Sequence, residues 1–169
     1  MNFEACIPSV LRFEGVYSND EHDPGGETKY GIDKKSHPDL NIKNLTEADA
    51  IEIYRQEYWI RNDCDVVPEV LRFAYFDCCV NQGPGLAKKF IQKALGLQAD
   101  GILGGQSRAR FKEVAQKSKE YQADYLASFL SLRMQAYASL SNFKYFGAGW
   151  SNRLMQVSAI SFKAHWASK

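Results

Sequence analysis

The sequence predicts an all-α protein, and three observations support this fold class. Apolar residues recur every three or four positions over most of the 169 residues. Helix-boundary residues, Pro68 and Gly96 among them, separate these segments. Strand signals are confined to residues 17–30, where a polar loop that contains Pro and Gly predicts a small β-hairpin flap.

Each expected helix has its own apolar stripe. The first ends at Glu14, and a short helix is expected at 29–36 before Pro38. Thr46 opens the next helix, and Asp49 follows three residues later, as in a capping box. Further helices are expected at 69–80, 86–95, 106–116, 119–140 and 149–166. One stripe favours core packing over a binding surface; it consists of Ala48, Ile51, Tyr54, Tyr58 and Trp59.

The composition is that of a folded protein with little net charge. The chain is 45% hydrophobic and 24% charged with a formal net charge of +1, which argues against disorder and against nucleic-acid binding. The four cysteines, Cys6, Cys64, Cys78 and Cys79, form no C-x-x-C pair, and the histidines are scattered. We therefore expect no metal site, no cofactor and cysteines that pack as small apolar residues.

Glu14 ends an apolar segment and precedes an acidic loop that Pro24-Gly25-Gly26 is expected to reverse. A carboxylate at a helix C-terminus faces the negative end of the helix dipole, which favours the protonated form that a general acid needs. The alternatives are a solvated acidic turn and a calcium loop. Calcium is disfavoured because counting from Asn19 puts Pro24 sixth, where an EF-hand loop needs Gly.

This stretch resembles the opening signature of glycoside hydrolase family 108. The motif reads Glu-Gly-x-Tyr from Glu14, then Asp-Pro-Gly-Gly-Glu-Thr-x-x-Gly-Ile from Asp23. The family comprises peptidoglycan-cleaving N-acetylmuramidases of phage endolysins and related bacterial proteins. The lysozyme superfamily has a Glu, Asp, Thr pattern across such a flap, which Glu14, Asp23 and Thr28 match. The chain departs from the pattern at Val16, where Gly is common, and in an Asp-to-Thr spacing one residue shorter than in typical phage lysozymes.

A second family-like motif reads Phe-Asp-x-x-Val-Asn-x-Gly and contains Asp77 and Asn81. Polar residues on an otherwise apolar helix need partners or a ligand. Two interpretations stand side by side. Either the two residues form a buried hydrogen-bonding pair, or Asn81 lines the sugar cleft.

The C-terminal half resembles the peptidoglycan-binding-like module that accompanies family 108 domains. The resemblance rests on Ala-Lys-Lys-x-x-Gln-x-x-Leu-Gly and Asp-Gly-x-x-Gly, between residues 87 and 104. Nucleotide binding by the glycine-rich loop is disfavoured because no Gly-Lys-Ser/Thr follows. Arg133, Tyr137 and a Gly-Trp-x-x-Arg element that ends at Arg153 also match the family. We expect a catalytic, lysozyme-like region at 1–83 and a helical, peptidoglycan-binding-like region at 84–169, packed as one compact unit.

The resemblance implies a muramidase that hydrolyses the β-1,4 bond between N-acetylmuramic acid and N-acetylglucosamine. Glu14 would be the general acid, and Asp23 and Thr28 would hold the attacking water, which favours an inverting reaction. Tyr17, Tyr30 and Asn81 are expected to line the sugar groove. A lytic transglycosylase, which yields 1,6-anhydro products, is disfavoured because it has no need of Asp23 and Thr28. A non-catalytic wall-binding protein is the other alternative.

The expected partners and location follow from the same resemblance. The chain opens with Met-Asn-Phe-Glu, which is unlike a signal peptide, and it has no run of about 18 apolar residues. We expect a monomeric endolysin of bacteriophage type, made in the cytoplasm without membrane insertion. It would reach the peptidoglycan glycan strands of the periplasm or cell wall through a holin or another delivery system, and lyse the host cell.

Overall fold

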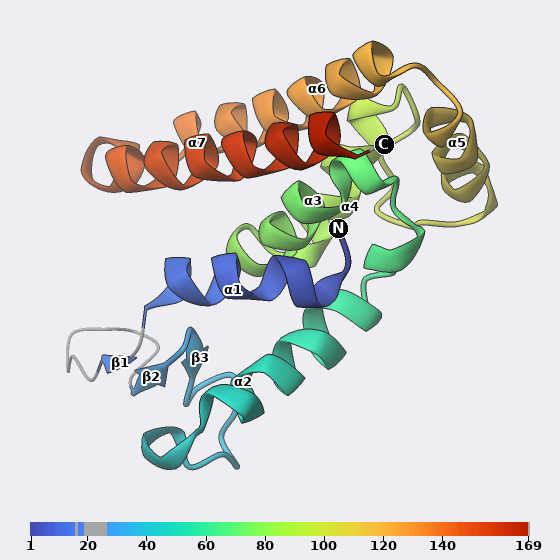
Figure 1. Ribbon diagram of the computed structural model, residues 1–169. Coiled ribbons are helices and arrows are strands. Elements are labelled where there is room, and N and C mark those ends of the chain that lie inside the picture. Colours follow the sequence, from blue (N-terminus) through green and yellow to red (C-terminus); the bar gives the residue numbers. More distant parts are fainter. Residues whose placement is uncertain (16, 19–26, 169) are drawn as a thin grey trace. The chain divides into compact units, whose positions relative to one another are not determined.

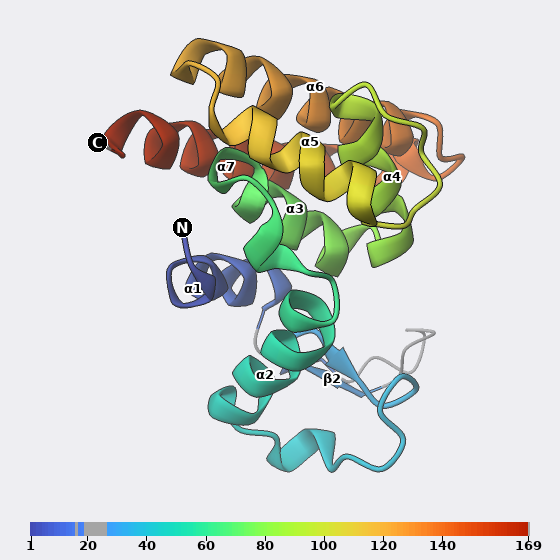
Figure 2. The same ribbon diagram turned by 90° about the vertical axis from the view of Figure 1, so that its right-hand side faces the viewer.

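A computed structural model describes residues 1–15, 17–18 and 27–168 (Figures 1 and 2). The backbone of Tyr17 and Ser18 is described without their side chains. The chain forms two compact units. The first comprises Asn2–Glu57, and the second comprises Met1 with Tyr58–Lys169.

The first unit begins with one helix that leads into a small sheet. Helix α1 spans Phe3–Glu14, and strands β1, β2 and β3 follow at Tyr17–Ser18, Thr28–Lys29 and Ile32–Asp33. The strands form an antiparallel sheet in the order β1-β2-β3. The unit continues with the 3₁₀ helix η1 (Ile42–Asn44) and α2 (Glu47–Ile53), and the π-helical segment η2 (Tyr54–Ile60) leads the chain from the first unit into the second. The predicted hairpin is confirmed, with a third strand added.

Side-chain caps start two of these helices. The Asn2 side chain accepts a hydrogen bond from the Ala5 amide at 3.1 Å, so one of the unpaired donors at the start of α1 is satisfied. The predicted capping box is present at α2: the Asp49 amide donates to the Thr46 hydroxyl at 3.2 Å, and the Thr46 amide donates to the Asp49 carboxylate at 3.0 Å.

The helix predicted at 29–36 is wrong, because this segment contains β2, β3 and the turn between them. The two turn residues, Tyr30 and Gly31, have φ values of 52° and 77°, and the flanking Lys29 and Ile32 pair across the hairpin. Positive φ at both central residues is the geometry of a type I′ turn, whose twist matches that of the strands. A right-handed helix has no place for two such residues in succession.

All the regular secondary structure among the described residues of the second unit is helical. After the 3₁₀ helix η3 (Cys64–Val66), it contains α3 (Glu69–Asn81), α4 (Pro84–Ala94), α5 (Gly105–Ala115), α6 (Lys119–Ala138) and α7 (Phe143–Ala167). Helices α6 and α7 run antiparallel and side by side, and both pack against α3 (Figures 1 and 2). The all-α prediction is confirmed.

Helix α7 begins six residues before the predicted start at 149, because its two early glycines continue the helix. A Cβ at Gly147 would lie 2.7 Å from the Phe143 ring, so glycine lets this ring pack directly against the helix backbone. Close packing outweighs the conformational cost of glycine in a helix here.

The cores consist of aliphatic, aromatic and cysteine side chains. Tyr54 and Trp59, from the predicted apolar stripe, are 1% and 2% exposed, so the core interpretation holds for both. All four cysteines are buried free thiols. Burial raises the pKa of the Cys78 thiol to about 12.

Candidate active site

Glu14 is the last residue of α1, and Gly15 ends the helix. Gly15 has φ 78°, a backbone conformation that glycine adopts without steric cost. The Glu14 side chain is half-buried. Its carboxyl group therefore lies at the C-terminal, negative end of the α1 dipole and is still accessible to solvent.

The Tyr30-Gly31 turn packs directly against Glu14. A Cβ added at Gly31 would lie 2.8 and 2.9 Å from Cβ and Cγ of Glu14, and 2.5 Å from the Tyr54 hydroxyl. These distances are shorter than side chains tolerate, so only glycine fits between the two residues. The Tyr54 hydroxyl also donates a hydrogen bond of 2.9 Å to the Tyr30 carbonyl. The turn is thus fixed from both sides, and it supports the stem of the Glu14 side chain.

Thr28 lies on β2, the middle strand, where it pairs with Ser18 on β1 and Asp33 on β3. Its side chain is half-buried. Asp33, which pairs with Thr28, is itself held by Ser36. Burial raises the pKa of the Asp33 carboxyl, but hydrogen bonds from the amide and side chain of Ser36 outweigh this effect, and the pKa is lowered. Thr28 therefore occupies a rigid position in the sheet that follows Glu14 in the same unit.

Tyr30 has a half-buried side chain in the hairpin turn, and the Lys29 ammonium lies over its ring at 5.7 Å. Asp23 lies outside the described residues, and so does the side chain of Tyr17. The roles predicted for these two residues stay predictions.

Asn81, the last residue of α3, belongs to the helical unit and is half-buried. Its side-chain oxygen accepts a hydrogen bond from the Tyr137 hydroxyl on α6. The Tyr137 ring in turn stacks on Trp150 of α7, with ring centres 5.2 Å apart and an interplanar angle of 17°. Three helices therefore fix the Asn81 side chain in one orientation.

Asp77, one turn before Asn81, is fully buried and binds two arginines. Its carboxylate accepts a bond of 2.7 Å from Arg133 and bonds of 3.0 and 2.8 Å from Arg153. Arg133 is also fully buried, and it donates to the Gln82 side chain at 2.7 Å and the Ala74 carbonyl at 3.2 Å. Of the two predicted interpretations, a buried hydrogen-bonded group applies to Asp77, although its partners are arginines and not Asn81.

The electrostatics of this group keep its members in defined protonation states. Burial opposes the charge of Arg133, but neighbouring groups, including Asp77, outweigh it, so the pKa of the guanidinium lies above its usual value. Burial raises the pKa of the Tyr137 hydroxyl, and Arg133 and Arg153 offset only part of that effect. Tyr137 is therefore a hydroxyl donor at every physiological pH.

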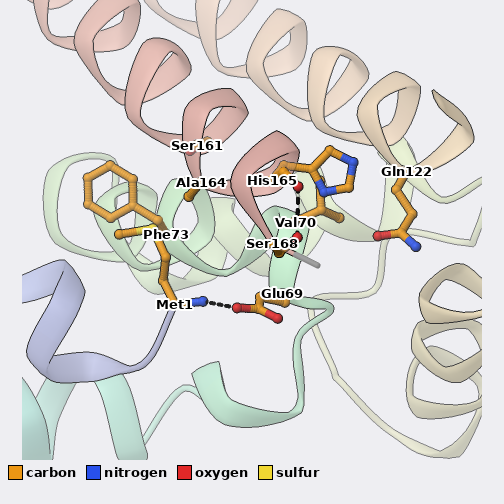
Figure 3. A pocket seen from close by; sticks show the side chains of 9 residues that line it. All are labelled: Met1, Glu69, Val70, Phe73, Gln122, Ser161, Ala164, His165 and Ser168. Atoms are coloured by element: carbon orange, nitrogen blue, oxygen red, sulfur yellow. Dashed lines mark hydrogen bonds and ion pairs between the residues drawn. The ribbon is translucent and has the colours of Figure 1, made fainter. Parts of the chain in front are cut away.

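The helical unit also encloses a cavity of about 160 Å³, which none of the predicted site residues lines (Figure 3). His165 closes one side and bonds to the Lys119 carbonyl at 2.9 Å through its ring nitrogen. The lining residues are Met1, Glu69, Val70, Phe73, Gln122, Ser161, Ala164, His165 and Ser168.

The described residues contain neither a metal site nor a membrane-spanning helix. No group of three or more His, Cys, Asp or Glu within that part of the chain is placed to hold a metal ion. No described helix combines the length and the apolar character needed to cross a membrane.

The helical fold, with an acid at the junction of α1 and the hairpin, matches the lysozyme-like architecture expected from the sequence. Residues 7–83 match the model of the family Glycosyl hydrolase 108. The structure is similar to that of SagA from Brucella abortus, with a TM-score of 0.81. The two sequences are 27% identical, and the match covers 95% of this chain and 94% of that chain. No curated protein matches the sequence. The family match supports a glycoside hydrolase in general.

Sequence reasoning missed the residues that position the predicted ones. Gly31 and Tyr54 fix Glu14, and Tyr137 fixes Asn81. Gly31 and Tyr137 were part of the family-like motifs, but without a role assigned to either. Tyr54 was visible only as a member of an apolar stripe, because a hydroxyl at the end of a buried ring leaves no trace in helical periodicity.

Proposed function

We propose that this chain is an N-acetylmuramidase, which hydrolyses the β-1,4 bond between N-acetylmuramic acid and N-acetylglucosamine with Glu14 as general acid. The observation that carries the proposal is the position of Glu14, at the end of α1 against the Gly31 turn. Because the stem of the side chain is supported by this turn, its carboxyl group is restricted in the positions from which it can meet the glycosidic oxygen, and general acid catalysis requires such positioning.

In this mechanism, the Glu14 proton goes to the oxygen that leaves with N-acetylglucosamine, and the bond from that oxygen to C1 of N-acetylmuramic acid breaks. A water molecule adds its hydroxyl group to C1. Asp23 takes the remaining proton of that water, and Thr28 holds the water through its own hydroxyl. Two residues that position a water favour an inverting reaction, in which the β-linkage gives an α-anomer.

The other predicted roles form part of the same proposal. The aromatic rings of Tyr17 and Tyr30 would pack on sugar rings of the glycan strand, and Asn81 would contact the sugars through its amide. We propose peptidoglycan binding for residues 84–169. In this region the buried Gln92 joins α4 to the glycine-rich loop, because its side chain donates a hydrogen bond of 2.7 Å to Asp100 and accepts one of 2.8 Å from the Gly101 amide. Delivery to the wall through a holin-type system is proposed on the resemblance alone.

Digestion of purified peptidoglycan, with mass analysis of the soluble products, tests this function. A muramidase releases muropeptides with reducing N-acetylmuramic acid ends. Products that are lighter by one water would identify a lytic transglycosylase, and reducing N-acetylglucosamine ends would identify a different glycosidase. Binding to peptidoglycan without any soluble product would indicate a wall-binding protein.

A further inference from the structure

We propose that Asn81 acts as a hydrogen-bond donor to the acetamido carbonyl of a peptidoglycan sugar, and that Tyr137 sets this specificity by fixing the orientation of the amide. This inference rests on the proposed function, because the sugar is taken from that substrate. The two ends of a side-chain amide have opposite hydrogen-bonding character, since the oxygen accepts and the NH₂ group donates. Whichever end is held by the protein, the other end faces the ligand.

The orientation follows from a chain of hydrogen bonds that begins at Asp77. The buried Asp77 carboxylate can only accept, and the arginine it binds, Arg133, can only donate. The positive charge of Arg133 acts on the Tyr137 hydroxyl, lowers its pKa in opposition to burial, and favours an orientation in which the hydroxyl oxygen faces the guanidinium. The hydroxyl proton of Tyr137 is therefore free to point the other way, to the side-chain oxygen of Asn81.

The side-chain oxygen of Asn81 is occupied by this bond, so its NH₂ group is the end that a ligand meets. Among the described residues, no hydrogen bond uses that NH₂ group, and the side chain is half-buried. A reversed amide would place its NH₂ group against the Tyr137 hydroxyl proton. The network therefore fixes Asn81 as a donor, and its matching partner is an oxygen that only accepts.

Two chemical features favour an acetamido group over a sugar hydroxyl. A carbonyl oxygen only accepts, whereas a hydroxyl also donates and would be less selective. An acetamido group also carries a methyl, and Tyr137 lies in an aromatic cluster with Trp150, against which Phe146 packs at 5.8 Å between ring centres. Phe146 is 55% exposed, so the cluster offers an apolar surface to a ligand. The acetamido group combines both requirements.

The test measures binding of the full chain to chitotetraose, a tetramer of N-acetylglucosamine, and to cellotetraose, which lacks the acetamido groups. Wild type should bind chitotetraose more tightly. Asn81→Ala should weaken chitotetraose binding by roughly tenfold, since one hydrogen bond is lost, and leave cellotetraose binding unchanged. Asn81→Asp, which replaces the donor by an acceptor, should weaken it at least as much.

Tyr137→Phe isolates the orienting role, because it keeps the ring and removes only the hydroxyl. It should weaken chitotetraose binding by a few fold and raise KM for peptidoglycan with kcat unchanged. Tyr121→Phe, at a residue 63% exposed on α6, is the matched control and should change nothing.

Equal binding of the two tetramers by wild type, or unchanged chitotetraose affinity in Asn81→Ala, would overturn the inference. These outcomes are separate from failure of the proposed function. A wild type that cleaves no peptidoglycan but binds chitotetraose through Asn81 would overturn hydrolysis and leave this inference standing.

Discussion

Gly31→Ala should reduce hydrolysis far more than its effect on stability explains. The added Cβ would lie 2.8 and 2.9 Å from Cβ and Cγ of Glu14 and 2.5 Å from the Tyr54 hydroxyl, whereas ordinary contacts begin at 3.4 Å. Glu14 must therefore retreat by roughly half an ångström. A misplacement of about 1 Å costs on the order of 10²-fold in rate, so a fall of roughly 10- to 100-fold is expected.

The stability cost has two sources. Alanine at positive φ costs about 1–2 kcal/mol, and overpacking costs about 1–3 kcal/mol. Together they predict a loss of about 2–5 kcal/mol in the free energy of unfolding, which urea titration followed by circular dichroism can measure. Activity is measured as the initial rate of reducing-end release from purified peptidoglycan, at a temperature where the variant is folded.

Gly96→Ala is the matched control. Gly96 also has a positive φ, 72°, but a Cβ there would meet nothing within 4 Å. Gly96→Ala should therefore lose only about 1–2 kcal/mol, the conformational cost of alanine at positive φ, and it should hydrolyse peptidoglycan at the wild-type rate. The double variant Gly31→Ala, Tyr54→Phe removes the closest contact, so its rate should stay low while part of the stability returns. If Gly31→Ala hydrolyses peptidoglycan at the wild-type rate, the turn does not position Glu14 and the reasoning is refuted.

Three further predictions concern the buried network, the thiols and the stereochemistry. Asp77→Asn should cost about 3–5 kcal/mol in urea unfolding, because it leaves the fully buried Arg133 and the largely buried Arg153 without a carboxylate. Glu113→Ala, which removes the exposed partner of Arg110, should cost less than about 1 kcal/mol. Equal losses would contradict the network's role. Because the pKa of Cys78 is raised to about 12, its thiol stays protonated as pH rises to 9. The native protein, whose cysteines are all buried, should therefore not react with a disulfide reagent at pH 8. Rapid reaction before unfolding would contradict this prediction. NMR at early times should show the α-anomer first, and a β-anomer would rule out the proposed role of Asp23 and Thr28.

Local sequence signals predicted most of the helices. The capping residues Thr46 and Asp49 lie three positions apart, and apolar residues at helical spacing are visible without any knowledge of the fold. The error at 29–36 has a physical cause. Tyrosine is uncommon at positive φ, so Tyr30-Gly31 lacks the Asn-Gly signal of a type I′ turn, and contacts with Tyr54 stabilise the turn instead.

The site was predictable only in part, for a related reason. Glu14 was recognisable because it ends an apolar segment, which is a local feature. Arg133 was visible as a charge within an apolar helix, but the sequence does not say that its partner is Asp77, 56 residues earlier. Pairings of this kind depend on how α3 and α6 pack, and a long-range contact has no local pattern.

The central claim, that Glu14 is the general acid of a peptidoglycan hydrolase, is tested most directly by the rate at which Glu14→Gln releases reducing ends from purified peptidoglycan. The substitution keeps the shape of the side chain and removes the proton that it transfers. The rate should fall by at least ~10²–10⁴-fold, with the melting temperature unchanged. A folded Glu14→Gln protein that hydrolyses peptidoglycan at a near wild-type rate would contradict the claim.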